Sequence, residues 1–324
     1  MIKPIFIFSL PRSGSTLLQR VLGSVPEIST VSEPWFLLPL FYSLKRDGCY
    51  SEYGHDVLVD AVEDICESLP NHIGDYHEAI AKFADCLYTK LSDPNSKYFL
   101  DKTPRYHLIS EEIIETFPDA KIIFLWRNPL SIVSSVINTW GIKGQWNLHA
   151  SKVDLFDGVE NLTGSYLNHK SRSFSIRYED LVSGSSDVWA SLFNYLEIPY
   201  QKEYIEKFAT LKLDGRLGDP TGIKEYSKLS DKTNTKWKQE LSNPIRKLWC
   251  RKYLEFIGRD RLLIMGFDID QLKAELDETT FTMKYMISDC IGLLYGLIYS
   301  YFEPRIFIDK LKRLYRKKRA FGHH

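Results

Sequence analysis

The chain has 324 residues, of which 44% are hydrophobic and 26% are charged, and its formal net charge is zero. These proportions are those of an ordinary globular protein, and a zero net charge provides no global field that would favour nucleic acid. The five cysteines are scattered and include no Cys-x-x-Cys pair, which argues against a disulfide framework or a zinc site and favours a reducing compartment. Because the first strand is expected to start at Ile5, we expect no signal peptide or membrane anchor ahead of it.

The most informative stretch runs from Ile5 to Leu22. An apolar run stops at Ser9, a short loop follows at 11–16, and apolar residues then recur at helical spacing. This order predicts a strand, a tight loop and a helix. Backbone N–H groups in such a loop can converge on an anion at the positive end of the helix. We therefore expect a phosphate-binding loop at the first strand of an α/β sheet, with a plain strand-to-helix turn as the alternative.

The next expected elements are a second strand and a helical region. A short strand near Ile28 leads into Ser32-Glu33-Pro34. Because Pro34 disfavours helical geometry at the preceding residue, the Glu33 carboxylate is expected on extended chain. Residues of about 52–92 have apolar positions at helical spacing, which predicts two helices that cover the sheet.

Three further strands are predicted, over 97–100, 121–126 and 173–177, and each ends in a polar cluster. Helices are expected over about 108–116 and 188–196, and another after Asn128 and Pro129, which suit the cap and first position of a helix. Strands alternating with helices predict a parallel sheet with helices on both faces and ligands at the carboxyl ends of the strands. The stretch 210–235 is predicted to be a long loop, and such loops are often functional.

The loop at 11–16 differs from the standard nucleoside-triphosphate loop, Gly-x-x-x-x-Gly-Lys-Ser/Thr. Ser9 stands in the place of the first glycine, Ser15 stands in the place of the lysine, and the positive charge lies instead on Arg12. A lysine that would reach a γ-phosphate is therefore missing from the motif, which argues against a kinase or an ATPase.

Taken together, these stretches resemble the family of sulfotransferases that use 3′-phosphoadenosine 5′-phosphosulfate (PAPS). The segment Pro11–Thr16 resembles the family's loop for the 5′-phosphosulfate, and Arg127 with Ser135 eight residues later resembles its 3′-phosphate site. Pro-Arg in the loop, a following Ser-Glu-Pro and an Asp-Lys-Thr-Pro resemble the bacterial and Golgi tyrosylprotein branch more than the cytosolic enzymes. The resemblance covers roughly residues 3–240. It implies a P-loop NTPase-like three-layer α/β fold, PAPS as co-substrate and no metal.

The resemblance also implies roles for individual residues. Glu33 is the candidate general base for the acceptor hydroxyl, while Lys102 and Arg12 would stabilise the leaving phosphate. The implied donor-binding residues are Arg12, Ser13, Gly14, Ser15, Thr16, Arg127, Ser135, Tyr178 and Lys236. The segment 218–230 would close over the donor. The basic Arg-Lys-Gly segment of the cytosolic enzymes is absent, which leaves the exact adenosine and 3′-phosphate contacts open.

Simpler interpretations of the same residues stay open at this point. Glu33 could be a solvated loop carboxylate, Lys102 could pair with Asp101 at the surface, and Arg127 could be a surface residue beside a core-facing Ser135. Four histidines are expected to be surface or packing residues, namely His55, His72, His77 and His107. Five aromatic residues are expected to line an acceptor cleft, namely Trp35, Phe36, Tyr106, Trp140 and Trp146.

The C-terminal region has a different character. Residues 290–302 are uncharged but fall short of the roughly 20 residues that span a bilayer. From 303 to 324, eight Lys and Arg residues stand against two acidic ones, a local net charge of +6, and 304–319 is predicted to be a basic amphipathic helix. This pattern favours reversible contact with an anionic membrane through 290–319. A helical hairpin packed on the catalytic domain, with a solvated basic tail, is the alternative.

We therefore predict a catalytic domain over 1–270 and a helical, basic extension over 271–324. The predicted activity is transfer of a sulfuryl group from PAPS to an acceptor hydroxyl, on a carbohydrate or a glycolipid. The expected location is the cytoplasm, with peripheral contact at the inner membrane face, and no nucleic-acid partner is expected. A P-loop-like nucleotide kinase and a non-catalytic, membrane-associated nucleotide-binding protein are the alternatives.

Overall fold

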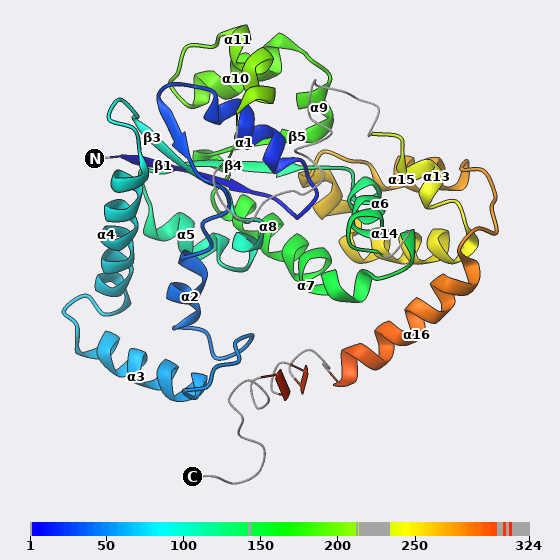
Figure 1. Cartoon of the computed structure of the whole chain (residues 1–324), viewed down its shortest axis with the longest axis horizontal. Helices are drawn as coiled ribbons and strands as arrows, with labels where there is room; N and C mark the ends of the chain where they lie inside the picture. The colour runs from blue at the N-terminus through cyan, green and yellow to red at the C-terminus, as the bar shows by residue number, and fades with distance from the viewer. Residues whose placement is uncertain are drawn as a thin grey trace.

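A parallel five-stranded sheet forms the centre of the computed structural model, which describes residues 2–141, 144–211, 213, 234–302, 307–308 and 311–312 (Figure 1). The strand order is β2-β3-β1-β4-β5, so β1 pairs with β3 on one side and with β4 on the other. The strands are β1 (Lys3–Phe8), β2 (Ile28–Thr30), β3 (Tyr98–Asp101), β4 (Lys121–Trp126) and β5 (Ser173–Arg177). The predicted α/β class is confirmed.

The central strands are buried on both faces, which explains why β1 and β4 are continuous apolar runs. Successive side chains of β1 point to opposite sides, so Ile5 and Ile7 pack in one core while Phe6 and Phe8 pack in the other. Two separate cores therefore lie on the two faces of one sheet. The three-layer arrangement with helices on both faces is confirmed.

One face is covered by the helix that follows β1 and by a group of helices that follow β5. They are α1 (Ser15–Gly23), α9 (Tyr178–Val182), α10 (Ser186–Tyr195) and α11 (Lys202–Lys207). The other core takes side chains from more helices, namely α2 (Leu37–Tyr42), α4 (Ile73–Leu91), α5 (Ser110–Thr116), α6 (Pro129–Trp140), α7 (Lys152–Leu155), α8 (Asp157–Asn168), α13 (Trp237–Glu240), α14 (Pro244–Ile264) and α15 (Ile269–Asp277).

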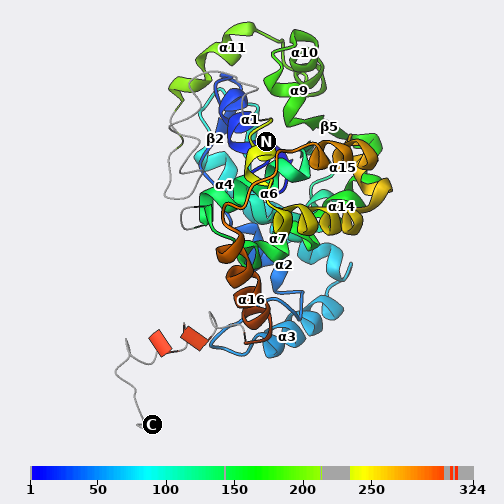
Figure 2. The same cartoon turned by 90° about the vertical axis from the view of Figure 1, so that its right-hand side faces the viewer.

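Most predicted elements are present, with differences in the region 37–116. The two helices expected over 52–92 are α3 (His55–Ser68) and α4, but only α4 contributes side chains to the core against the sheet. Figures 1 and 2 show α3 beyond α2 and α4, away from the sheet, so the prediction that both helices cover it is wrong for α3. Helix α5 starts later than expected, because residues 104–108 form a short 3₁₀ turn that Pro104 begins.

The C-terminal part packs on the same core before it leaves the domain. Helix α15 crosses the predicted boundary at residue 270, and its Leu272 and Leu276 are buried in the core of the sheet's second face. The division at that residue therefore stays a prediction. Helix α16 (Met286–Phe302) follows along the edge of the molecule. None of the described helices is long and apolar enough to cross a membrane. The predicted closing segment 218–230 lies outside the described residues, as does most of the predicted helix 304–319.

Candidate functional site

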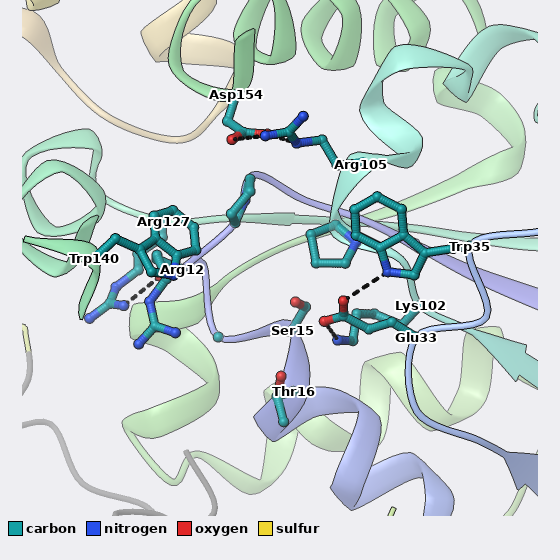
Figure 3. Close-up of a pocket in the computed structure, with 13 residues that line it drawn as sticks. Arg12, Ser15, Thr16, Glu33, Trp35, Lys102, Arg105, Arg127, Trp140 and Asp154 are labelled. Atoms are coloured by element: carbon teal, nitrogen blue, oxygen red, sulfur yellow. Dashed lines mark hydrogen bonds and ion pairs between the residues drawn. The ribbon is translucent and has the colours of Figure 1, made fainter. Parts of the chain in front are cut away.

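The polar ends of β1, β3 and β4 meet around one cavity of about 210 Å³ (Figure 3). This is the edge of the sheet at which ligands were expected, because the carboxyl ends of parallel strands lie together. The lining residues are Pro11, Arg12, Gly14, Ser15, Thr16, Glu33, Trp35, Lys102, Pro104, Arg105, Arg127, Trp140 and Asp154. Most of the predicted site residues are therefore neighbours in space.

The loop between β1 and α1 has the backbone of an anion cradle. Arg12 and Gly14 both have left-handed backbone geometry, with φ values of 72° and 89°. A Cβ at Gly14 would lie 2.3 Å from a ring carbon of the buried Tyr178, so only glycine fits there. No side chain caps the N-terminus of α1, and the buried Ser13 hydroxyl has no hydrogen-bond partner among the described residues. Left-handed turns of this kind and helix N-termini present N–H groups to anions.

Arg127 joins this loop from the end of β4. It is buried, its Nη1 donates to the carbonyl of Arg12 at 2.7 Å, and its guanidinium lies 4.4 Å from the centre of the Tyr178 ring. Its Nε has no hydrogen-bond partner among the residues that the structure describes. From helix α6, Ser135 accepts a hydrogen bond from Nε of Arg12 at 3.1 Å. The two predicted phosphate motifs thus meet, and the interpretation of Arg127 as a surface residue is wrong.

Glu33 and Lys102 form an ion pair at the opposite side of the cavity (Figure 3). Lys102 Nζ lies 2.7 Å from Oε1 of Glu33, and the two side chains are 1% and 12% exposed. Trp35 donates from its indole nitrogen to the second carboxylate oxygen, Oε2, at 3.1 Å. Glu33 is therefore largely buried and held by two donors rather than free in solvent, and Lys102 does not form the surface pair with Asp101 that sequence left open.

Asp101 instead belongs to a buried network behind Lys102. Its carboxylate accepts hydrogen bonds from the hydroxyls of Tyr88 at 2.7 Å and Tyr106 at 3.1 Å. Thr103 donates to Asp101 at 3.4 Å and accepts from the backbone N–H of Trp35 at 3.2 Å. Burial raises the pKa of Asp101 to about 7, although these hydrogen bonds act in the opposite direction. The network fixes the backbone on both sides of Lys102 and ties it to Trp35.

A second buried carboxylate, Asp154, holds Arg105 at the edge of the cavity. Arg105 donates from Nη2 to Oδ2 at 3.1 Å, and its Nε lies 2.7 Å from Oδ1 in the same ion pair. The same carboxylate lies 3.0 Å from Nε2 of His107, which is fully buried. His107 was expected to be a packing residue, and it indeed lies in the interior. Its partner is 47 positions away, so no local spacing could have indicated this group.

Two of the five predicted cleft aromatics, Trp35 and Trp140, line the cavity. The other three do not: Phe36 packs on Tyr88, Tyr106 is buried in the core, and Trp146 packs elsewhere. The prediction is wrong for them because sequence cannot show which aromatic rings fill the core. Lys236 is exposed just before α13 and is not among the lining residues, so its role stays a prediction.

Comparisons with known proteins agree with these motifs. A family model described as "Sulfotransferase family" matches residues 4–202. Nodulation protein NoeE of Sinorhizobium fredii is 33% identical over 138 residues, which are 42% of this chain and 32% of that protein. The protein-tyrosine sulfotransferase of Drosophila melanogaster is 26% identical over 231 residues, 68% of this chain and 42% of that protein. The chain spans less than half the length of these relatives.

A similar solved structure is a sulfotransferase domain from the curacin biosynthetic pathway. It has a TM-score of 0.47 and 21% sequence identity, and the match covers 74% of this chain and 91% of that domain.

Proposed function

Because the chain belongs to the sulfotransferase family, we propose that it transfers a sulfuryl group from PAPS to the hydroxyl of an acceptor. The observation that carries this proposal is one cavity that combines an anion-binding loop with cationic side chains and a fixed carboxylate. Arg12, Lys102 and Arg127 are the cations that would meet the donor, and Glu33 is the carboxylate that would meet the acceptor. A fourth cation, Arg105, pairs with a second carboxylate, Asp154, at the edge of the cavity. Sulfuryl transfer needs both: positive charge beside the leaving phosphate, and a base beside the acceptor.

The residues at the loop suit the two phosphate groups of the donor. Left-handed turns at Arg12 and Gly14 and the uncapped start of α1 would hold the 5′-phosphosulfate. Nε of Arg127, which has no partner among the described residues, and the nearby Ser135 would hold the 3′-phosphate. When bound, PAPS would supply an activated sulfuryl group attached to a phosphate that can leave.

Two hydrogen-bond donors, one charged and one neutral, orient the Glu33 carboxylate. Lys102 binds Oε1 and Trp35 binds Oε2, yet each carboxylate oxygen keeps a further lone pair that can accept a proton from an acceptor hydroxyl. Lys102 carries a buried positive charge on the same cavity as the loop. An anion on the loop would share that charge, which would weaken the hold of Lys102 on Glu33 and free the carboxylate to meet the acceptor hydroxyl.

The acceptor is proposed to be a carbohydrate or a glycolipid. Trp35 and Trp140 line the cavity, and indole rings offer flat apolar faces for sugars together with a polar nitrogen. A glycolipid would be met at a membrane, through the peripheral contact predicted for 290–319. A cytoplasmic location is supported by the free thiols of all five cysteines, which the structure does not pair.

Calorimetry with the desulfated product, 3′-phosphoadenosine 5′-phosphate (PAP), and with ATP tests this proposal. We expect PAP to bind without magnesium and more tightly than ATP. Preference for ATP with Mg²⁺ would reject the proposal in favour of a nucleotide kinase. Unchanged sulfuryl transfer by Glu33→Gln would remove Glu33 as the base. Tight PAP binding with no transfer to any acceptor would favour the non-catalytic nucleotide-binding protein.

A further inference from the structure

Helix α16 has one face that packs on the domain. Asp289 is buried on this face, where its carboxylate accepts hydrogen bonds from Arg246, at 2.7 Å and 2.9 Å, and from Asn243 at 2.7 Å. One and two turns later, Gly292 lies against the backbone of Trp146, where a Cβ would come within 2.6 Å of its carbonyl oxygen, and the buried Gly296 lies against His149. A buried ion pair and two close glycine contacts therefore fix which way α16 faces.

The opposite face of α16 is apolar and exposed. Residues at helical spacing on this face are 58–85% exposed, namely Ile287, Ile291, Leu294, Ile298 and Tyr301. Leu297 and Phe302 extend the same surface. A contiguous apolar patch of this kind on a soluble domain marks an interaction site. We call these seven residues the outward face of α16.

Two observations indicate which kind of partner the outward face would contact. The segment that follows in the sequence, 303–319, contains eight basic and two acidic residues, so the apolar helix is followed directly by a positively charged stretch of chain. Over the residues that the structure describes, α16 has 17 residues and is about 26 Å long, which is less than the hydrocarbon thickness of a bilayer, and Asp289 holds its other face on the protein. Such a helix lies along a membrane surface rather than across it. We propose that the outward face of α16 docks on an anionic lipid bilayer.

A second hollow lies between this helix and the neighbouring part of the domain. Its lining includes Tyr299 and Ser300 from α16, His149 and Lys152 from the neighbouring segment, and Arg105. Arg105 also lines the active-site cavity, so both hollows border this side chain. Docking would bring the edge of the cavity at Arg105 toward the bilayer, from which a lipid-linked acceptor could enter. This link to the acceptor rests on the proposed function, whereas the docking itself does not.

Co-sedimentation of the full chain with vesicles tests the docking. We expect binding to vesicles that contain phosphatidylglycerol at low salt, with at least a tenfold loss of affinity on pure phosphatidylcholine or at high salt. The double variant Ile291→Ser, Leu294→Ser should bind anionic vesicles at least about tenfold more weakly, because each residue loses apolar burial. The control, Leu167→Ser with Leu263→Ser, replaces leucines of similar exposure, 58% and 57%, on α8 and α14, and should bind like the wild type.

Folding and nucleotide binding are measured on the same samples, by circular dichroism and by calorimetry with PAP. Unchanged PAP binding in the α16 variant would show that lost docking is not a lost active site. Failure of PAP binding with intact docking would instead reject only the proposed function. The docking proposal is overturned if the wild type does not sediment with anionic vesicles, if both double variants lose binding equally, or if the outward face pairs two copies into a dimer that binds no vesicle.

Discussion

Replacement of Glu33 by glutamine perturbs the charge at the centre of the site with little change in shape. Lys102 is 1% exposed and Glu33 is 12% exposed, and 2.7 Å separates their charged atoms. Glutamine keeps a carbonyl oxygen for Trp35 but leaves the Lys102 ammonium buried without its counter-ion. We expect the free energy of unfolding to fall by about 3 kcal/mol, the lower end for a broken buried ion pair, because Glu33 retains some exposure.

The same variant should separate binding from transfer. Because Lys102 keeps its charge and loses one anion, the phosphates of PAP should bind about threefold to tenfold more tightly, a gain of about 1 kcal/mol. Sulfuryl transfer should fall by about 100-fold to 10,000-fold, the range for loss of a general base. Tighter binding of PAP together with lost turnover would distinguish a general base that is paired with Lys102 from a residue that merely supports the fold.

Urea unfolding of Glu33→Gln, Lys102→Met and the double variant measures the pair directly. We expect the double variant to be more stable than the sum of the single changes implies, by about 1–3 kcal/mol of coupling. Glu160→Gln is the control, because it removes one charge from an exposed pair with Arg261 and should cost at most about 1 kcal/mol. Additive single effects, or weaker PAP binding by Glu33→Gln, would refute this reasoning.

Three further changes test other parts of the site. Gly14→Ala should weaken PAP binding at least about tenfold in calorimetry, because the added Cβ would clash with the Tyr178 ring. The control Gly74→Ala should have no effect, because the atom nearest to its added Cβ is 3.8 Å away. Arg127→Gln should weaken PAP binding about 10-fold to 100-fold but leave adenosine 5′-phosphate binding nearly unchanged, since only PAP has a 3′-phosphate. Burial raises the pKa of Asp101 from 3.8 to about 7, so the folded protein keeps a proton that the unfolded chain releases. The free energy of unfolding should therefore fall by a few kcal/mol as pH rises from about 4 to about 7, and Asp101→Asn should flatten this part of its pH profile. Identical pH profiles for the wild type and the variant would contradict the burial argument.

Sequence predicted the parts of the fold that depend on local patterns. The strands β1 and β4 are continuous apolar runs, and the start of α6 is marked by Asn128, whose side chain accepts from the N–H of Leu130. The sequence also placed the 11–16 loop and Arg127 directly after strands, and the structure shows that these strands, β1 and β4, are parallel neighbours.

The partners of the buried charges could not be predicted, because they lie far apart in the chain. Lys102 and Glu33 are 69 positions apart, and His107 and Asp154 are 47 positions apart. Sequence therefore placed Glu33 and Lys102 in the site only through resemblance, and missed that they bind each other. The uniform apolar run 290–302 likewise hid the two faces of α16, which only the contacts of Asp289 and the glycines distinguish.

The most direct test of sulfuryl transfer is to follow labelled sulfur from PAPS into acceptors of a cell extract that contains glycans, lipids and small alcohols. If the proposed function is correct, the wild type will label at least one hydroxyl-bearing acceptor without added metal, and Glu33→Gln will not, although it binds PAP. Transfer of phosphate from ATP in place of sulfur, or equal labelling by Glu33→Gln, would contradict it.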